Sequence, residues 1–269
     1  MEIAPALYGN LEDFVTDVRS NGRYEFNLDE VKAKFQLSDN TINQALYRLK
    51  NKKSIAQIRK GFYAILSPEY SKQGMVPPAL FIDDMMRALG KRYYVALLSA
   101  AALHGAAHQQ PMEYFVITEK PALRAIKNKK LKINFFIKKD WQDQDIEQIK
   151  TDAGDINVST PELTALDLLY YLESTGLNQT FTILRELVAE LKAPNLLRTA
   201  KFYPQTAAIQ RLGYLLDHEL HEEKLAGVLS KVLDERSIFP VPLALNRKKE
   251  GVVDSKWKVI KNIEIESDL

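Results

Sequence analysis

The chain has 269 residues, of which 46% are hydrophobic and 27% charged, and its formal net charge is +2. This composition is that of a soluble globular protein, and the length favours two domains over one. The absence of cysteine excludes disulfides, thiolate metal sites and cysteine nucleophiles. The N-terminus lacks an apolar stretch of signal-peptide length, and the apolar run at 95–107 is too short to span a bilayer. We therefore expect a cytoplasmic protein that does not contact membranes.

The first predicted elements are a helix and then a short strand followed by a second helix. From Leu11 onward apolar residues repeat at helical spacing, and Asn21-Gly22 ends this helix. The stretch "YEFNLDEVKAKF" begins as a strand and continues as a helix, with Asn27 or Asp29 as its cap. The residues that we expect to be buried in it are Val31, Ala33 and Phe35.

A third helix and a hairpin complete this N-terminal pattern. Ser38 is a good N-cap, because its hydroxyl can accept a free backbone N–H of the first turn. Lys60-Gly61 then separates two short segments with the alternation of a β-hairpin. Helix, strand, helix, turn, helix and hairpin is the element order of a winged helix-turn-helix domain. One apolar stripe of the third helix is expected to face the interior: Ile42, Ala45, Leu46 and Leu49.

The rest of the chain predicts a larger, mixed domain. Prolines and a glycine mark a linker, so the predicted division is a winged helix-turn-helix domain at 1–68, a linker at 69–78 and a C-terminal domain at 79–269. The fold class is α+β, with a mixed α/β C-terminal domain that ends in a helical part. Its expected elements are helices at 78–89 and 93–107, strands at 113–118 and 131–139 with a helix-capable 121–130 between them, a strand pair within 144–159, a helix started by Thr160-Pro161, helices at 180–192, 194–201, 205–219 and 222–234, and a strand within 256–266.

Charge is unevenly distributed along this nearly neutral chain. Residues 1–31 hold two basic and seven acidic side chains, whereas residues 32–60 hold eight basic and one acidic. Residues 120–139 hold eight basic side chains and no acidic one. Two separate basic zones indicate local contacts with anions rather than a uniformly charged coat.

The third helix has the side chains of a DNA-reading helix opposite its apolar stripe. Asn and Gln can pair with adenine and Arg with guanine in the major groove, and hydroxyls at a helix start can bond phosphate. The candidate recognition residues are Ser38, Asn40, Thr41, Asn43, Gln44, Tyr47 and Arg48. The candidate contacts from the helix end and the wing to the DNA backbone are Lys50, Lys52, Lys53, Arg59 and Lys60. The alternative is an ordinary surface helix and hairpin whose charges are merely solvated.

A candidate second basic surface lies in the 120–139 zone. Its members are Lys120, Arg124, Lys127, Lys129, Lys130 and Lys132, with Lys138 and Lys139 closing the strand that follows. These side chains either contact a nucleic-acid backbone or guard an exposed strand edge against pairing.

Catalytic and metal-binding motifs are not evident. His104 and His108 stand four residues apart, but Gly105 replaces the glutamate of the metalloprotease motif. A closed zinc site needs further ligands, and hydrogen bonding by these histidines is the better reading. There is no phosphate-binding glycine loop. We expect no enzyme activity, no catalytic residue, no metal and no cofactor.

The chain resembles the AbiEi-type antitoxins of bacterial type IV toxin–antitoxin (abortive infection) systems. The resemblance covers most of the chain, and its most specific segment is "SAAALHGAAHQQP". The segments that carry it are "RKGFYAI", "YYVALLSAAALHGAAHQQP" (93–111), "VSTPELTALDLL" (158–169), "QRLGYLLD" (210–217) and "KWKVIKNIEIESDL" (256–269).

The resemblance implies a two-domain transcriptional repressor that binds inverted repeats of double-stranded operator DNA in its own promoter, with two protomers on two half-sites and dimerisation on DNA. It also implies an antitoxin that counteracts a cognate nucleotidyltransferase toxin without a stable complex. The alternative is a protein- or RNA-interaction module that binds a toxin or its RNA substrate directly.

Overall fold

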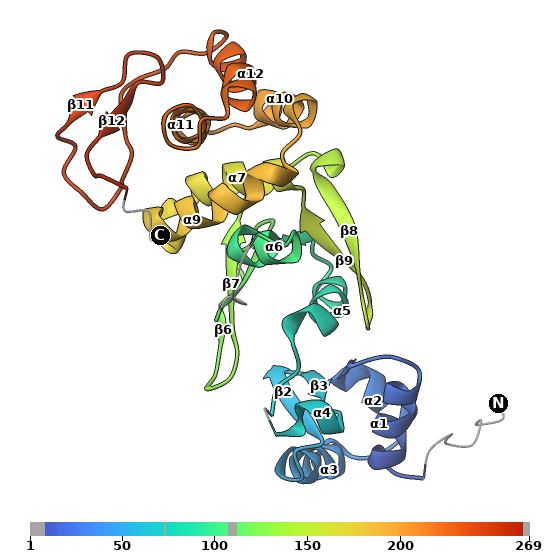
Figure 1. Cartoon of the computed structure of the whole chain (residues 1–269). Coiled ribbons are helices and arrows are strands. Elements are labelled where there is room, and N and C mark those ends of the chain that lie inside the picture. The colour runs from blue at the N-terminus through green and yellow to red at the C-terminus, as the bar shows by residue number, and fades with distance from the viewer. Residues whose placement is uncertain (1–8, 73, 107–111, 266–269) are drawn as a thin grey trace. The chain divides into compact units, whose positions relative to one another are not determined.

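The computed structural model describes residues 9–72, 74–106 and 112–265. Helices and several β-sheets are both present, so the predicted mixed α and β class is confirmed (Figure 1). Contacts divide the chain into two compact units. The first contains 1–92, 123–134 and 148–156, and the second contains 93–122, 135–147 and 157–269. The division at 69–78 stays a prediction about independently folding domains.

The first unit begins with the element order that the sequence predicts. Each of the first three helices starts at a capping side chain: Asn10 accepts the backbone N–H of Asp13, Asn27 that of Glu30 at 2.7 Å, and Ser38 that of Thr41 at 3.2 Å. The caps predicted at Asn27 and Ser38 are therefore confirmed. The elements are α1 (Leu11–Ser20), β1 (Glu25–Asn27), α2 (Leu28–Lys34), α3 (Asp39–Asn51), β2 (Ile55–Arg59) and β3 (Phe62–Ile65).

A small aromatic core holds these elements around a three-stranded antiparallel sheet of order β1-β3-β2. The ring of Phe14 meets those of Phe26 and Phe35 edge to face, and Phe26 stacks on Tyr63. Ala33 is exposed, so its predicted burial is wrong. The reason is helical geometry, because two residues beyond the buried Val31 a side chain points to the opposite side of α2.

The segment predicted as a linker contains short helices. Pro68 opens α4 (Pro68–Ser71), and Pro78 opens the 3-10 helix η1 (Pro78–Leu80). The predicted helix after it is α5 (Ile82–Ala88), whose apolar side buries Ile82, Met85 and Met86.

A six-stranded sheet of order β6-β7-β5-β4-β9-β8 follows. β4 pairs antiparallel with β5 and parallel with β9. A 3-10 turn, η2 (Asp143–Asp145), precedes β8. The strands are β4 (Tyr93–Val95), β5 (Tyr114–Thr118), β6 (Ile126–Lys127), β7 (Lys132–Ile137), β8 (Ile146–Thr151) and β9 (Gly154–Ser159).

Two helix predictions are wrong in this sheet region. Residues 93–95 form the central strand β4, and helix α6 (Leu97–Leu103) begins only after it. Residues 121–130 form no helix. They lead into β6 and a turn in which the Asn128 side-chain oxygen accepts the backbone N–H of Lys130 at 2.8 Å, and the Asn128 backbone N–H donates to the Leu131 oxygen at 2.9 Å. Asparagine at such a turn favours the hairpin over a helix.

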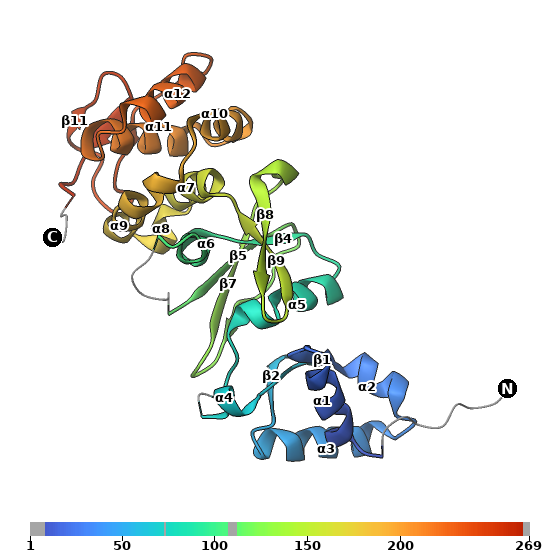
Figure 2. The same cartoon turned by 45° about the vertical axis from the view of Figure 1, so that its right-hand side comes forward.

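In the second unit, α6 packs against β5 and α7 packs against α6. In both views α6 and α7 lie on the same side of the strands, and α10 to α12 lie beyond α7 (Figures 1 and 2). α7 contacts α6, α9, α10 and α11. Helices occur where the sequence predicts them in this part: α7 (Pro161–Tyr170), α9 (Leu177–Leu187) with η3 (Val188–Glu190), α10 (Ala193–Phe202), α11 (Thr206–Tyr214) with the π-helical η4 (Leu215–Glu219), and α12 (Glu223–Leu233). The short helix α8 (Leu172–Thr175) is an additional element that the sequence analysis did not predict. None of the helices in the described ranges is long and apolar enough to cross a membrane.

A third sheet, of three strands, lies in the C-terminal part of the chain. Its strands are β10 (Val241–Pro242), β11 (Val252–Val253) and β12 (Val259–Lys261), in the order β10-β12-β11. The segment before β12 is anchored by the fully buried Trp257, whose indole N–H donates to Asp217 at 2.8 Å. Gly213 of α11 lies directly against this ring, so a Cβ there would overlap its six-membered part.

Two glycine-to-alanine substitutions should therefore have opposite effects. Gly213→Ala forces a methyl group into the Trp257 ring and should lower the free energy of unfolding by about 1–3 kcal/mol. Gly227→Ala, in α12 with open space around it, should raise it by about 0.5–1 kcal/mol through helix propensity. Urea denaturation followed by circular dichroism measures both, and equal effects would contradict the packing described.

Candidate functional site

Helix α3 separates a buried apolar side from an exposed polar side. Ile42, Leu46 and Leu49 are at most 3% exposed and belong to the core of the first unit, with Ala45 packed partly against it. The predicted inward stripe is thus confirmed. The spacing of these residues leaves the opposite side of α3 available to solvent.

The predicted recognition residues all lie on exposed positions of α3 or its cap. They are Ser38, Asn40, Thr41, Asn43, Gln44, Tyr47 and Arg48. Tyr47 is 61% exposed, which is high for a large aromatic side chain. The hydroxyls of Ser38 and Thr41 are 2.8 Å apart and share the capping turn. Amide, hydroxyl, phenol and guanidinium groups therefore form one continuous polar surface.

The predicted backbone contacts lie at the end of α3 and on the β2–β3 hairpin. Gly61, with φ +77°, forms the hairpin turn beside Arg59 and Lys60. Lys53 is exposed, whereas Lys50 donates to the Gln57 side chain at 3.3 Å. Lys52 forms an ion pair with Glu12 of α1. The Glu12 carboxylate therefore competes with a phosphate for Lys52.

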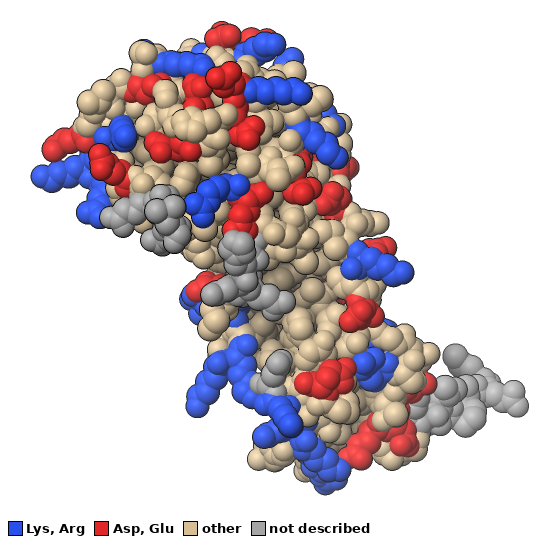
Figure 3. Space-filling view, viewed as in Figure 1, with Lys and Arg blue, Asp and Glu red and all other residues tan. Residues whose placement is uncertain are grey.

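The second basic zone is distributed over β6, β7 and the chain before them. Lys120, Arg124, Lys127, Lys129 and Lys130 are exposed, and Lys132 is half-buried. Lys and Arg side chains gather over the β6–β7 hairpin and over the α3 and β2–β3 region on the face shown in Figure 3. The role of both zones in binding stays a prediction.

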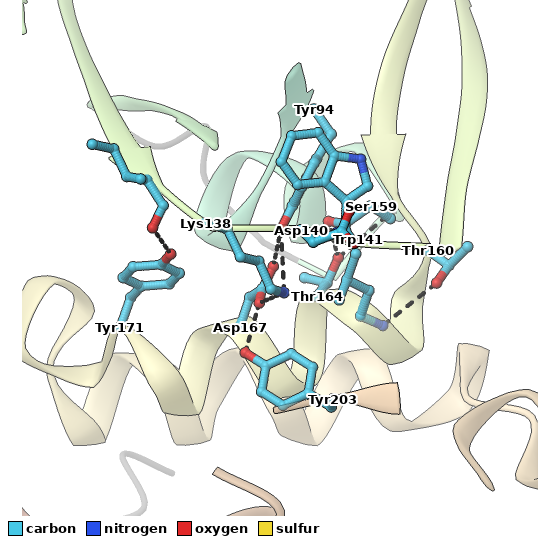
Figure 4. A network of polar contacts seen from close by, with 12 residues as sticks. Tyr94, Lys138, Asp140, Trp141, Ser159, Thr160, Thr164, Asp167, Tyr171 and Tyr203 are labelled. Carbon is cyan, nitrogen blue, oxygen red and sulfur yellow. Dashed lines mark hydrogen bonds and ion pairs between the residues drawn. The ribbon is translucent and has the colours of Figure 1, made fainter. Parts of the chain in front are cut away.

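Lys138, unlike the other lysines of this zone, is buried. Its side chain is 4% exposed and forms an ion pair of 2.6 Å with Asp167 of α7, which is fully buried. Tyr94 of β4 and Tyr203, which follows α10, each donate a hydroxyl to the same carboxylate at 2.7 Å. The Lys138 ammonium also lies 4.3 Å from the centre of the Tyr203 ring. Figure 4 shows these four side chains converging from four elements.

The electrostatics of this Asp167 cluster are consistent with its geometry. Burial and the charge of Asp167 raise the pKa of both the Tyr94 and the Tyr203 hydroxyl well above the usual range. Both phenols therefore stay protonated and act as donors. With one ammonium and two hydroxyls around one carboxylate, the arrangement satisfies a buried charge and resembles a structural anchor more than an acid–base site.

A second polar contact in this unit involves His104. Its Nε2 lies 2.7 Å from the backbone oxygen of Ser159, and its Nδ1 lies 3.4 Å from Glu147. His104 thus makes hydrogen bonds, while His108 lies outside the described residues. No group of three potential metal ligands occurs in the described part of the chain.

Sequence reasoning missed the Asp167 cluster. A signal was present, since Asp167 is a lone carboxylate within the apolar stretch "ELTALDLLYYL". A buried carboxylate requires a partner. The partner, Lys138, was grouped with surface lysines because its position in the sequence adjoins them.

Comparisons with known proteins find one family model that matches part of the chain. Residues 94–218 match the model of the AbiEi antitoxin C-terminal domain, which confirms the resemblance drawn from the sequence. The crystal structure of the RV2827C protein from Mycobacterium tuberculosis is similar, with a TM-score of 0.66 and 18% sequence identity, over 92% of this chain and 89% of that chain. At this identity the likeness shows the fold. No curated protein matches the chain.

Removing the charge of Asp167 should strongly destabilise the protein. Asp167→Asn leaves the Lys138 ammonium buried without a counter-charge, and the free energy of unfolding should fall by about 3–5 kcal/mol. Urea denaturation monitored by circular dichroism measures this loss.

The matched control is Glu173→Gln on the exposed surface of α8, which should change stability by less than about 0.5 kcal/mol. The double variant Lys138→Met with Asp167→Asn should recover part of the loss, since no unpaired ammonium remains. A double variant no more stable than Asp167→Asn alone would show that the ion pair is not the reason for the loss.

Proposed function

We propose, from the match of residues 94–218 to the model of the AbiEi antitoxin C-terminal domain, that the chain is a sequence-specific DNA-binding repressor and antitoxin of a type IV toxin–antitoxin system. Its N-terminal elements act as a winged helix-turn-helix domain on inverted repeats of its own promoter. Its C-terminal domain counteracts a nucleotidyltransferase toxin without a stable complex. The proposed protein works in the cytoplasm and catalyses no reaction.

The observation that carries the DNA-binding part is the exposed polar side of α3. The apolar residues of α3 are buried in the core, whereas Asn43, Gln44 and Arg48 are exposed and are therefore available to base edges. Amide groups of this kind suit adenine, and a guanidinium suits guanine. A purely solvated helix face would not need this set of planar hydrogen-bonding groups.

The backbone contacts follow from the charges around α3. Lys53 and Lys60 are exposed, and Arg59 is half-exposed beside the turn of the hairpin, which takes the role of the wing. Serine and threonine at the start of α3 lie where free backbone N–H groups favour a phosphate. The lysines of the β6–β7 hairpin add a second site of backbone contact in this proposal.

Arg48→Ala is the principal test. If the guanidinium pairs with one guanine, the variant should lose about 1–3 kcal/mol of affinity for the promoter and relax preference at one base pair. Gel shifts with the gene's own upstream DNA, and with single-base variants of it at physiological salt, measure both effects.

The control for Arg48→Ala is Arg185→Ala, an exposed arginine of α9, which should leave binding unchanged. An equal loss on every sequence would show that Arg48 contacts only phosphate. Lack of promoter binding by the unaltered chain, together with co-purification of a neighbouring gene product, would favour the alternative, a module that binds toxin or RNA directly.

The Glu12–Lys52 ion pair gives a second test. Glu12→Gln removes the carboxylate that competes for Lys52, so promoter affinity should rise and the slope of log K against log salt should steepen by up to about 0.9. The comparison is Asp17→Asn, on the same helix. An unchanged slope in Glu12→Gln would remove Lys52 from the contact set.

A further inference from the structure

A pocket of about 360 Å³ lies in the second unit, between the end of β7 and the end of α10. No residue of α3 lines it. Lys138 and Tyr203 of the Asp167 cluster are among its lining residues. Its lining is Ile137, Lys138, Lys139, Asp140, Trp141, Gln142, Asp145, Leu163, Tyr170, Thr199, Phe202, Tyr203, Pro204 and Gln205.

Aromatic side chains make up much of the wall. Trp141 and Tyr203 are buried in it, whereas Phe202 is 61% and Tyr170 38% exposed. Phe202 and Tyr170 lie at the ends of α10 and α7, and the Tyr170 ring also meets the Tyr171 ring edge to face, with 4.5 Å between the centroids. Exposed rings beside a concave surface are suited to stack on a flat ligand.

The polar groups of the wall indicate which chemical groups a bound ligand would have. Asp145 accepts from Thr199 at 2.7 Å and pairs with Arg198 at 3.6 Å, so its charge is compensated. Lys138 is compensated by Asp167. Lys139 is exposed and adds a cation at the pocket. The side-chain oxygen of Gln205 is buried and has no hydrogen-bond partner among the described residues.

We propose that this pocket binds the unpaired base of a nucleotide, free or at the end of a single strand. The base stacks on Phe202 and Tyr170, and Lys139 neutralises the phosphate. An exocyclic amine of the base donates to the oxygen of the Gln205 amide, which lines the pocket and otherwise has no donor among the described residues. This proposal is independent of promoter recognition by α3, because the two sites share no residue.

Tryptophan fluorescence of the full chain gives a direct readout. The chain has two tryptophans, of which Trp141 lines the pocket and Trp257 is fully buried near the C-terminus. Titration with cytidine 5′-monophosphate should change the emission saturably, with uridine 5′-monophosphate binding more weakly because it lacks the amine. A short single-stranded oligocytidine, titrated in parallel, shows by tighter or weaker binding whether a strand or the free nucleotide is the preferred form.

Phe202→Ala and Tyr170→Ala should each weaken binding by about tenfold through lost stacking. Phe239→Ala, which changes a still more exposed phenylalanine outside the pocket, should leave binding unchanged. The proposal is overturned if no nucleotide changes the emission, or if Phe202→Ala and Phe239→Ala bind alike. Equal affinity for the cytidine and uridine nucleotides would overturn the role given to Gln205. Each variant's circular dichroism spectrum and urea midpoint exclude unfolding as the cause.

Discussion

The second unit depends on one buried carboxylate. Asp167 stands in the middle of α7, the helix that contacts the sheet-covering α6 as well as α10 and α11. By accepting from Lys138, Tyr94 and Tyr203 it connects the end of β7, the central strand β4 and the segment after α10. An isolated buried charge would be very costly, so the carboxylate favours the arrangement of strands and helices that brings all three donors to it.

The same cluster shows where sequence reasoning succeeds and where it cannot. Local signals predicted correctly the Ser38 cap, the buried stripe of α3 and the helix that begins after Thr160, because each depends on residues within a few positions of one another. The pairing of Lys138 with Asp167 joins residues 29 positions apart, and no spacing rule identifies the partner. A lysine beside another lysine at the end of a strand has the same local appearance whether it is solvated or buried.

The sequence prediction at β4 was wrong for a related reason. Its three residues, Tyr93 to Val95, are followed at once by an alanine-rich helix, so the apolar pattern is continuous across the boundary. Burial of all three comes from neighbours on both sides, β5 and β9, that are distant in the sequence. At 121–130 the decisive contact is local, because the side chain of Asn128 closes a turn. Its signal in the sequence is weak, since the surrounding lysines favour a helix.

The separation of buried and exposed residues on α3 has a consequence for the evolution of the sequence. The residues that hold the helix in the fold and the residues that face solvent are disjoint sets. Substitutions on the outer side leave the folding free energy nearly untouched, as is usual for solvent-facing positions. Under the proposed function, duplicated copies of the gene can therefore diverge in the DNA sequence that they recognise, one side chain at a time, while each keeps the same fold.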